Sequence, residues 1–466
     1  MIRYFTAAVL YAAAAMPGRA EVNIQEVTSP GGITAWLVEE HSIPFTALEM
    51  RFRGGTSLDA PGKRGATYLM AGLLEEGAGD LDARAFAREV EALAASFDYD
   101  VHDDTFTVSA KFLSENRDEA IALLRKSLIE PTFADDAVER VRAQVLSIVK
   151  SNLTDPEEIA SEGFAERIYG DHPYATSGEG TMETVAALTP DDLRAAWQAA
   201  MVRDRLYIGA VGDITPEELS ALLDDLLGEL PATGPALAGP ATLTFDGGTH
   251  VIDFDTPQSV VIFGQPGMAM DDPDFFAAYI LSTIIGGGGF DSILMEEVRE
   301  KRGLTYGVYS YLLDKDDAKV WLGSVSSAND RVADAIQVIR DEWARVARDG
   351  VTAEQLEDAK KFMTGSYPLR FDGNGPIANI IAGMQVNGMP IDYAATRNDQ
   401  VNAVTLEQIN RVASELMDPD ALTFVVAGKP EGLAAEERVE GSAPATAVTP
   451  PAEEGADTGA ETAPAN

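Results

Sequence analysis

The sequence predicts an α+β protein made of two similar domains, each a sandwich of one sheet with helices packed on it. Each half of the chain places strands before long amphipathic helices, which is the order typical of α+β layers. A helix followed by a strand also recurs at an offset of 216 residues, at Thr189–Gly212 and again at Thr405–Gly428. Within these two segments Thr, Leu or Ile, Met, Leu and Gly coincide without a gap. Such self-similarity indicates that one structural unit is used twice.

The elements of the two halves follow each other in the same order. In the first half we expect two strands, an apolar helix, a further strand and two long helices, at Thr34–Val38, Thr46–Arg53, Ala66–Leu74, Asp104–Phe112, Glu115–Leu128 and Asp135–Ser151. In the second half the same series falls at Thr249–Asp253, Ser259–Phe263, Phe275–Ile285, Lys319–Ser326, Asp330–Arg348 and Ala353–Met363. In each repeated unit, the Thr that opens the helix suits an N-cap, and the Gly that closes the strand predicts a turn.

The predicted domain boundaries lie where the composition changes. A linker rich in Pro and Gly, residues 232–246, separates a first domain at 21–231 from a second domain at 247–432. Both domains then have an ordinary size of about 200 residues. The segment 433–466 is rich in Ala, Pro, Glu and Thr and has few large apolar residues, so we expect a disordered acidic tail.

Residues 1–20 have the features of a secretory signal peptide. Arg3 supplies the positive start, Phe5–Met16 is a largely apolar run, and the small residues Gly18 and Ala20 end it. The run is too short to cross a bilayer, and no other stretch is long enough, so no membrane span is expected. We therefore expect a periplasmic or secreted protein. The absence of cysteine is compatible with this location, because exported proteins can form disulfides but do not need them. The alternative interpretation is a buried N-terminal helix.

Charge and the rare residue types exclude several functions. The chain has 76 Asp and Glu against 35 Lys and Arg, a net charge of −41, which argues against binding to nucleic acid or to an anionic membrane. It has no cysteine, so disulfides, thiolate metal sites and a cysteine nucleophile are excluded. Its four histidines are far apart in sequence, and we expect each to be a surface or packed residue: His41, His102, His172 and His250.

Residues 284–310 carry the most specific motif. They read IIGGGGFDSILMEEVREKRGLTYGVYS, which combines a Gly-rich turn, a helix ending in Arg-Glu-Lys-Arg-Gly-Leu, and a strand with Tyr-x-Val-x-Ser. This stretch resembles the signature of the second domain in the pitrilysin/insulinase-like peptidases, family M16. His172, Tyr174 and Gly180 also stand where that family has a loop before a Thr-x-x-Asp-Leu helix. The resemblance covers residues 21–432 and implies two homologous α+β domains of the M16 type.

The zinc motif of that family is missing from this chain. In active members the first domain carries H-x-x-E-H on a helix, where two histidines hold zinc and the glutamate is the general base. Aligned on Gly65, the five positions fall on residues 67–71, with Thr67 and Ala71 in place of the histidines and Met70 in place of the glutamate. The window for a third ligand, residues 142–151, contains no Asp or Glu. We therefore expect this chain to bind no metal and no other cofactor.

Acidic residues just beyond the motif allow a second interpretation. Glu75, Glu76, Asp80 and Asp82 carry the oxygen donors of a site for a hard cation. In so acidic a chain they also suit a solvated loop, and we favour that interpretation.

Arg299 and Tyr306 match a pair that, in active family members, reaches from the second domain into the zinc site of the first. The resemblance implies that Arg299 ends a helix, that Tyr306 starts the next strand, and that both donate hydrogen bonds to a substrate carbonyl and its oxyanion. Without the resemblance, the two are a surface residue and a half-buried strand residue. The four glycines before them fit either a helix-ending turn or a loop that a peptide approaches closely: Gly286, Gly287, Gly288 and Gly289.

The resemblance implies a peptidase subunit that lacks its own zinc site. Some family members are heterodimers in which one chain has the zinc motif and the other has the Arg/Tyr pair, and this chain fits the second description. It would pair with an H-x-x-E-H subunit that holds zinc, enclose a peptide or unfolded protein, and be inactive alone. The alternative is a non-catalytic peptide-binding or scaffold protein with the same fold. A third interpretation, an active metallopeptidase with an unusual ligand set, needs distant histidines to converge.

Overall fold

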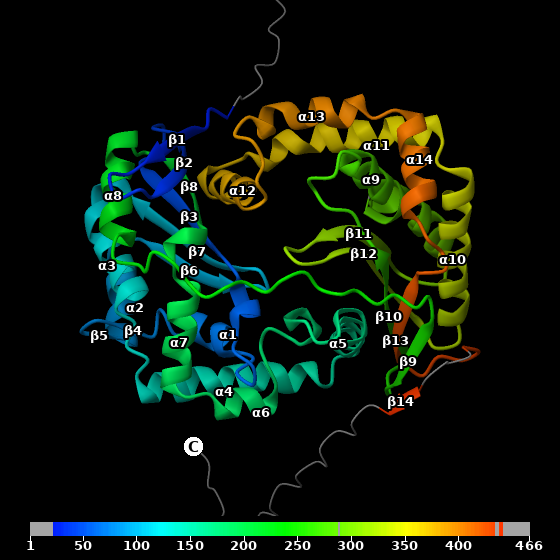
Figure 1. Cartoon of the computed structure of the whole chain (residues 1–466), viewed down its shortest axis with the longest axis horizontal. Coiled ribbons are helices and arrows are strands. Elements are labelled where there is room, and N and C mark those ends of the chain that lie inside the picture. Colours follow the sequence, from blue (N-terminus) through cyan, green and yellow to red (C-terminus); the bar gives the residue numbers. More distant parts are fainter. Residues whose placement is uncertain (1–21, 288, 434–437, 441–466) are drawn as a thin grey trace, which may run out of the picture.

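The computed structural model describes residues 22–287, 289–433 and 438–440, in which two six-stranded sheets stand side by side (Figure 1). The first sheet has the order β1-β2-β8-β3-β7-β6, with β1 (Gln25–Thr28), β2 (Thr34–Glu39), β3 (Phe45–Arg53), β6 (Ser96–Val101), β7 (Thr105–Leu113) and β8 (Leu206–Gly212). The second has the order β11-β12-β10-β13-β9-β14, with β9 (Thr249–Asp253), β10 (Gln258–Pro266), β11 (Val308–Asp314), β12 (Lys319–Ala328), β13 (Thr423–Gly428) and β14 (Arg438–Glu440).

The two sheets share one topology over five strands. In the first sheet, β8 runs parallel to β2 and antiparallel to β3, and β7 and β6 continue antiparallel. In the second, β13 runs parallel to β9 and antiparallel to β10, and β12 and β11 continue antiparallel. Gly212 and Gly428, which are 216 residues apart, both end the repeated strand. The predicted architecture of two similar α+β domains is confirmed.

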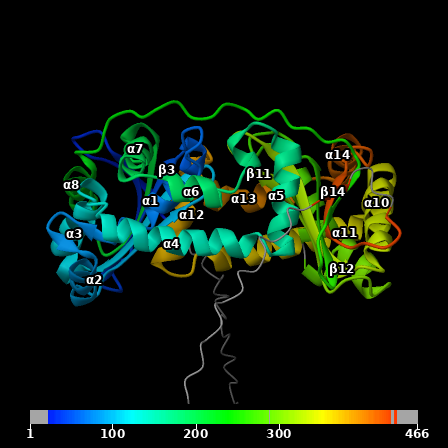
Figure 2. The same ribbon diagram turned by 90° about the horizontal axis from the view of Figure 1, so that it is seen from below.

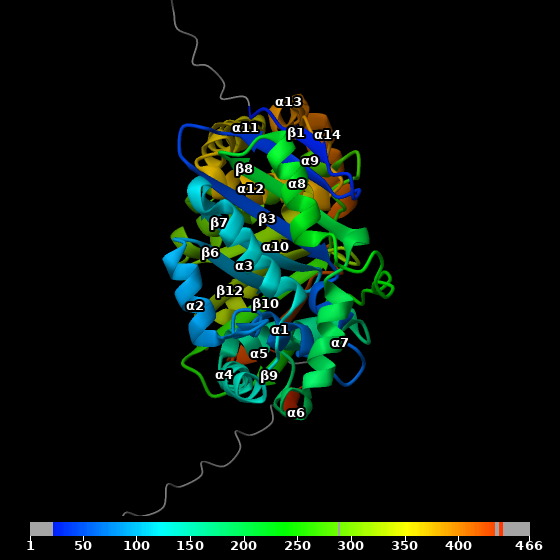
Figure 3. The same cartoon turned by 90° about the vertical axis from the view of Figure 1, so that its left-hand side faces the viewer.

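Helices cover the outer face of each sheet. Over the first sheet lie α1 (Ala66–Ala71), α2 (Ala83–Ala92), α3 (Arg117–Ile129), α7 (Pro190–Ala200) and α8 (Pro216–Leu227) (Figure 3). A small ribbon of β4 (Gly77–Ala78) and β5 (Leu81–Asp82) lies next to α2. Over the second sheet lie α9 (Phe275–Ser282), α10 (Val332–Asp349) and α14 (Leu406–Leu416). The repeated helices α7 and α14 both begin with a capping box, from Thr189 and Thr405, as their sequence predicts.

Further helices run along two opposite sides of the molecule. α4 (Asp135–Asn152) and α6 (Met182–Ala187) lie at the lower side in Figure 1, and α11 (Ala353–Ser366) and α13 (Tyr393–Ala403) lie at the upper side. Each domain has its own apolar core between its sheet and its outer helices. Phe52 and Phe106 are fully buried in the first core, and Phe263, Trp321 and Trp343 are buried in the second.

α5 (Pro156–Tyr169) comes from the first half of the chain but packs on the inner face of the second sheet. Its residues Phe164 and Ile168 form one apolar cluster with Val260 of β10 and Val425 of β13. Residues 156–169 therefore lie in the predicted first domain by sequence and cover the second sheet in space.

α12 (Asn374–Val386) makes the reverse crossing and covers the inner face of the first sheet. Ala378 and Ile381 of this helix form an apolar cluster with Trp36 of β2 and Val211 of β8. A Cβ atom on Gly209 of β8 would lie 2.3 Å from the carbonyl oxygen of Ala378, so the helix backbone approaches the strand too closely for any other residue. The two exchanged helices lock the domains together and fix how they face each other.

The turns of two equivalent hairpins meet at the domain junction. Lys315, between β11 and β12, forms an ion pair with Asp103, between β6 and β7. The backbone N–H of Asp316 donates to Asp104 Oδ2 at 3.1 Å, and the Tyr174 hydroxyl donates to the same carboxylate. Because these groups come from both halves of the chain, they hold the two sheets at one relative orientation.

The linker, residues 232–246, contains no helix or strand and crosses this junction as one extended segment (Figure 2). His172 Nε2 lies 3.0 Å from the carbonyl oxygen of Gly239, and the backbone N–H of Ala241 donates to the carbonyl oxygen of Asp317 at 2.9 Å. His172 and Tyr174 thus contact the linker and the junction, and they hold these segments together.

Some element ends differ from the expectation. The helix expected over Ala66–Leu74 ends at Ala71, and the helix expected to reach Ile285 ends at Ser282 and continues as a π-helical segment, Thr283–Gly287. Residues 438–440 were expected in the disordered tail but form β14 beside β9, so the expectation is wrong for these three residues. The rest of the tail after Leu433 and the signal peptide at 1–20 lie outside the described residues. None of the described helices is long and apolar enough to span a membrane.

Candidate functional site

Arg299 and Tyr306 lie together on one cleft at an end of the second sheet. The cleft has a volume of about 650 Å³ and is lined by the loop 303–306 and by the ends of β10 and β12. Arg299 stands in the last turn of a π-helical segment, Met295–Glu300, and its side chain is about one-third exposed. Tyr306 precedes β11 by two residues and is 88% exposed. The structure brings the two sequence-predicted residues together, with Tyr306 just before the strand rather than in it.

The loop that carries Tyr306 is anchored on both sides. Thr305 Oγ1 donates to the carbonyl oxygen of Ser326 at 2.6 Å and accepts from the backbone N–H of Gly307 at 3.1 Å. Ser327 Oγ donates to the carbonyl oxygen of Leu304 at 2.5 Å. Because the backbone is held by these bonds, the exposed phenol is presented from a fixed position, and binding a ligand there costs little loop ordering.

Two more exposed tyrosines follow along β11, which is an edge strand of its sheet. Val308 and Ser310 point into the core, whereas Tyr309 and Tyr311 on the other face are 52% and 49% exposed. An edge strand offers free backbone donors and acceptors to an added strand, and aromatic side chains beside it offer pockets for alternate residues of a peptide. Sequence reasoning missed these two residues, although the alternation of Tyr309 and Tyr311 with smaller residues was a readable signal.

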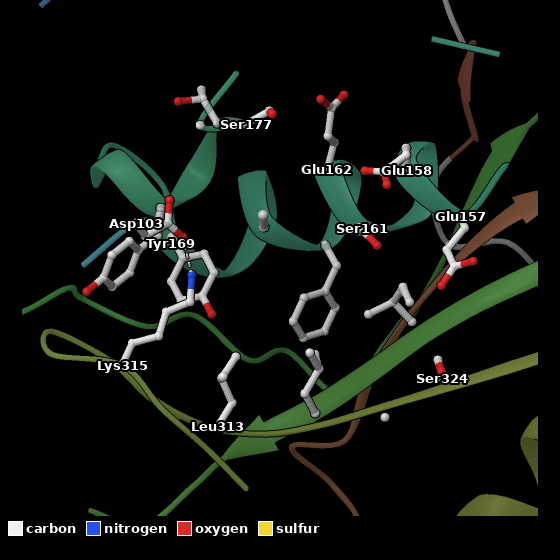
Figure 4. Close-up of a pocket in the computed structure, with 18 of the residues that line it drawn as sticks. Asp103, Glu157, Glu158, Ser161, Glu162, Tyr169, Ser177, Leu313, Lys315 and Ser324 are labelled. Carbon is white, nitrogen blue, oxygen red and sulfur yellow. Dashed lines mark hydrogen bonds and ion pairs between the residues drawn. The ribbon is translucent and has the colours of Figure 1, made fainter. Parts of the chain in front are cut away.

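The edge of β11 leads to a cavity of about 330 Å³ between α5 and the second sheet (Figure 4). Its sheet side is apolar and includes Ile262 and Leu322, and its helix side carries Glu157, Glu158 and Glu162. Among the described residues, none of these three carboxylates has an ion-pair partner. Burial, together with the neighbouring carboxylates, raises the pKa of Glu158 and of Glu162. The cavity therefore joins an apolar floor to negative charge that is not neutralised.

One end of this cavity holds a cation from the chain itself. The ammonium of Lys315 lies 4.2 Å from the centre of the Tyr174 ring and 5.5 Å from that of Tyr169, and it pairs with Asp103 (Figure 4). Burial raises the pKa of Asp103, but Lys315, Arg64 and Thr56 together outweigh that effect and leave the pKa below its usual value. Aromatic faces and a carboxylate form a favourable environment for an ammonium group.

The residues at the predicted zinc-motif positions are buried in the core of the first domain. Thr67 and Met70 are fully buried, and Ala71 is nearly so. Thr67 Oγ1 donates to Asp59 Oδ1 at 2.7 Å. The hydroxyl is therefore used in a hydrogen bond next to the start of α1 and does not point into a cavity. The side of α1 that faces a cavity carries Tyr68. A ligand set moved by one residue to that side would use Tyr68, Ala71 and Gly72, which also supply no imidazole or carboxylate.

The remaining candidate ligands are dispersed. His41 lies beside Asp213, and His250 beside Asp246, at 2.8 Å and 3.0 Å. In the acidic loop, Glu76 pairs with Arg140, Asp80 pairs with Lys126 and Asp82 caps α2. Within the described residues there is no group of three or more His, Asp or Glu arranged to hold a metal ion. These residues do not fit the zinc of active family members, because a catalytic zinc needs about three protein ligands.

The Gly-rich turn requires glycine at two of its positions, at one for packing and at the other for the backbone conformation. A Cβ atom on Gly286 would lie 2.5 Å from the backbone nitrogen of Ser310, so this glycine lets the helix end contact β11. Gly289 has a φ of +78°, which favours glycine. Gly287 has no such crowding, and Gly288 lies outside the described residues. The close approach that glycine allows at Gly286 is to the chain's own strand β11.

Comparison with known proteins gives the family of the chain. The model of the insulinase family, peptidase family M16, matches residues 35–182, and that of the peptidase M16 inactive domain matches residues 187–363. A Helicobacter pylori protein named as the non-peptidase homolog YmxG is 28% identical over 83% of this chain and 90% of its own length. An uncharacterized zinc protease of Streptomyces coelicolor is 27% identical over 84% of this chain and 88% of its own length.

A solved structure supports the same assignment. The crystal structure of a peptidase M16 inactive domain from Pseudomonas fluorescens matches with a TM-score of 0.82 and 28% identity, and covers 90% of this chain and all of that one. A protease structure from Helicobacter pylori, with a TM-score of 0.78 and 18% identity, has the same fold. The chain therefore belongs to peptidase family M16 and is a member of its non-catalytic type.

Proposed function

We propose that this chain is the zinc-lacking, substrate-binding subunit of a periplasmic M16 peptidase and that it pairs with a subunit carrying H-x-x-E-H. The observation that supports the proposal is the placement of Arg299 and Tyr306 on one open cleft, with Tyr306 held outward by an anchored loop. A protein with only a scaffold role has no need for an exposed phenol beside a guanidinium.

In this proposal the partner subunit holds zinc, which supplies the activated water. This chain holds the peptide and donates hydrogen bonds. The Arg299 guanidinium and the Tyr306 hydroxyl are both donors, and aimed at a peptide carbonyl they stabilise the negative charge that develops on its oxygen. The edge of β11 supplies backbone hydrogen bonds to an extended peptide, with Tyr309 and Tyr311 alongside.

We further propose that the substrate is rich in Lys or Arg. Glu157, Glu158 and Glu162 line the cavity next to β11 as exposed side chains, and none has an ion-pair partner among the described residues. Lys315, in its cage of two tyrosines and Asp103, is an internal example of an ammonium bound in the same cavity. A second cationic side chain lying on the apolar floor would lower the repulsion among the α5 carboxylates.

The test is turnover of a basic peptide by the reconstituted heterodimer. The partner is identified as a co-purifying chain, or the product of a neighbouring gene, that carries H-x-x-E-H. Arg299→Ala in this chain should lower turnover by about 10²-fold, as expected for losing one oxyanion donor. Tyr306→Phe should lower it by about tenfold, because a neutral donor contributes less. Arg348→Ala, on the far end of α10 and paired with Asp349, is the matched control.

A second function, peptide binding without hydrolysis, is favoured by the relative named as a non-peptidase homolog. The same proteins and peptides distinguish hydrolysis in a heterodimer from binding alone. If basic peptides bind this chain but no partner restores turnover, the binding function holds. If Arg299→Ala leaves heterodimer turnover unchanged, the proposed role of the Arg/Tyr pair is wrong. Export is tested separately, by the N-terminal sequence of the periplasmic protein, which should begin near Glu21.

A further inference from the structure

The cleft beside Tyr306 concentrates positive charge in an acidic chain. The charged residues that line it are Arg299, Arg331 and Glu300, and because Arg299 lies 3.8 Å from Glu300, the positive charge in excess is that of Arg331. The chain as a whole has 76 acidic residues against 35 basic ones. This local excess of guanidinium groups favours an anionic ligand at this place, in contrast to the acidic cavity beside α5.

Arg331 is held at the rim of the cleft and is open to a ligand. Its Nη1 donates to the carbonyl oxygen of Gly303 at 3.2 Å, which fixes the guanidinium next to the Tyr306 loop. The side chain is exposed, and among the described residues no carboxylate lies within ion-pair distance of it. The planar fork of an arginine matches the two oxygens of a carboxylate better than any other side chain does.

The last described strand brings the chain to the same end of the sheet. β14 runs parallel to β9, with Glu440 opposite Asp253 at the end of β9. Gln258, which lines the cleft, begins β10 at that end and is paired with Ala328. In the strand order, β10 is three strands from β14, a separation of about 15 Å at the usual strand spacing.

The residues that follow β14 carry the complementary charge. Residues 441–466 include Glu453, Glu454, Asp457 and Glu461 and no Lys or Arg. Glu453 is 13 residues beyond Glu440. Thirteen residues of fully extended chain reach at most about 45 Å, which covers the distance to the cleft. When the span matches, the tethered group is present at an effective concentration of the order of millimolar.

We propose that the cleft of Arg299 and Arg331 is a carboxylate-binding site and that the acidic segment 453–461 of the same chain occupies it. The segment then competes with any ligand that uses the Arg/Tyr cleft, including the substrate under the proposed function. The inference uses the same cleft but needs no partner subunit and no turnover, so it is tested on the isolated chain.

The probe is a fluorescently labelled synthetic peptide of residues 450–463, and its binding is measured by anisotropy. The wild-type chain is compared with a full-length variant that has Glu453→Gln, Glu454→Gln, Asp457→Asn and Glu461→Gln. The variant with the neutral segment should bind the probe at least about tenfold more tightly than the wild type, because its cleft lacks the tethered competitor. A probe with its own acids changed to amides should bind at least about tenfold more weakly, since charge-assisted bonds are lost.

The arginine is tested in the neutral-segment background. Arg331→Gln should weaken probe binding by about tenfold and Arg331→Lys by less, whereas Arg348→Gln should change nothing. Thermal unfolding of each variant checks that it is folded, so a loss of binding is read only from folded chains. Equal binding by the wild type and the neutral-segment variant would overturn the assignment of the segment as occupant. No binding by either would overturn the carboxylate site, and neither result would touch the heterodimer test with Arg299→Ala.

Discussion

α5 and α12 hold equivalent places in the two halves of the molecule but differ in the chemistry they present. Each crosses from its own half to cover the inner face of the other sheet, and each buries small and apolar residues there. α12 contains no charged residue, whereas α5 carries five, of which four are glutamates. The packing role is therefore common to both helices, and the charge is an addition on α5 alone.

The cavities under the two helices extend this contrast. Under α12, burial raises the pKa of Glu49 too, but this carboxylate accepts a hydrogen bond from Ser109 Oγ at 2.5 Å and lies 3.7 Å from Arg51, so it has partners. Under α5, the carboxylates of Glu158 and Glu162 repel one another, and their pKa values rise with burial. A carboxylate whose charge is balanced by neighbouring groups of the chain, such as Glu49, has a structural role. The carboxylates of Glu158 and Glu162 have no such partner and are available to a ligand. Four experiments test this comparison between α5 and α12.

The largest effect is expected where the helices contact their sheets. Gly209→Ala places a Cβ atom 2.3 Å from the carbonyl oxygen of Ala378, a backbone atom that cannot move without lifting α12. We expect a loss of about 3 kcal/mol in the free energy of unfolding, at the upper end for overpacking. Gly163→Ala in α5 meets the Cδ1 atom of Ile252 at 2.5 Å, which can rotate away. There the gain in helix propensity, about 1 kcal/mol, should offset the crowding.

Urea unfolding of both variants measures this difference. If Gly163→Ala proves as destabilising as Gly209→Ala, α5 is docked as tightly as α12, and the cavity beside it cannot widen for a ligand.

The next effect concerns peptide affinity. Changing Glu157, Glu158 and Glu162 to Gln together should weaken binding of a Lys-rich peptide to the isolated chain by about tenfold, at roughly 0.5 kcal/mol for each partly exposed pair. Glu49→Gln, in the cavity under α12, should leave peptide affinity unchanged. Titration calorimetry at low salt gives both values, and equal effects of the two changes would remove the distinction between the cavities.

A smaller effect is expected from pH. Because the pKa values of Glu158 and Glu162 are raised, these groups take up protons at a higher pH than an ordinary glutamate does. Affinity for a Lys-rich peptide should therefore fall as the pH is lowered from 7.5 toward 5, and the Gln variant should show a flatter profile. An affinity that rises on acidification would mean that the carboxylates do not contact the peptide.

The smallest effect concerns stability. A carboxyl whose pKa is raised in the folded state binds protons more readily there than in the unfolded chain, so its ionised form weighs against folding at neutral pH. Glu162→Gln should remove that penalty and stabilise the chain slightly at pH 7, by less than about 0.5 kcal/mol because the side chain is partly exposed. This gain in stability should disappear at a pH below the pKa of an ordinary glutamate, where the carboxyl is protonated in both the folded and the unfolded chain. Thermal unfolding at the two pH values checks the sign.

The repeated unit and the candidate cleft were accessible from the sequence. The offset of 216 residues between Thr189 and Thr405 places β8 and β13 at the same point of two equivalent sheets. The segment 284–310 leads directly to the cleft of Arg299 and Tyr306. The repeated unit and the position of the cleft can be found in the sequence because helix caps, strand-ending glycines and a specific motif are local signals that tertiary contacts preserve.

The sequence did not reveal that α5 and α12 each cover the sheet of the other half of the chain. The amphipathic pattern of α5 shows that one face is buried, but it does not say which sheet covers that face, and the sequence order suggests the wrong one. The acidic cavity, the cage around Lys315 and the role of Arg331 depend on that exchange or on contacts between distant segments.

The proposed function requires that zinc is held by the partner subunit and not by this chain. The most direct test is the zinc content of the purified chain from residue 21 onward, measured by elemental analysis after dialysis against trace zinc, alone and in complex with its H-x-x-E-H partner. We expect essentially no zinc in the chain alone and about one zinc for each heterodimer. About one zinc bound per isolated chain would contradict the proposed function, because a metal site would then exist where the described residues offer no ligand set.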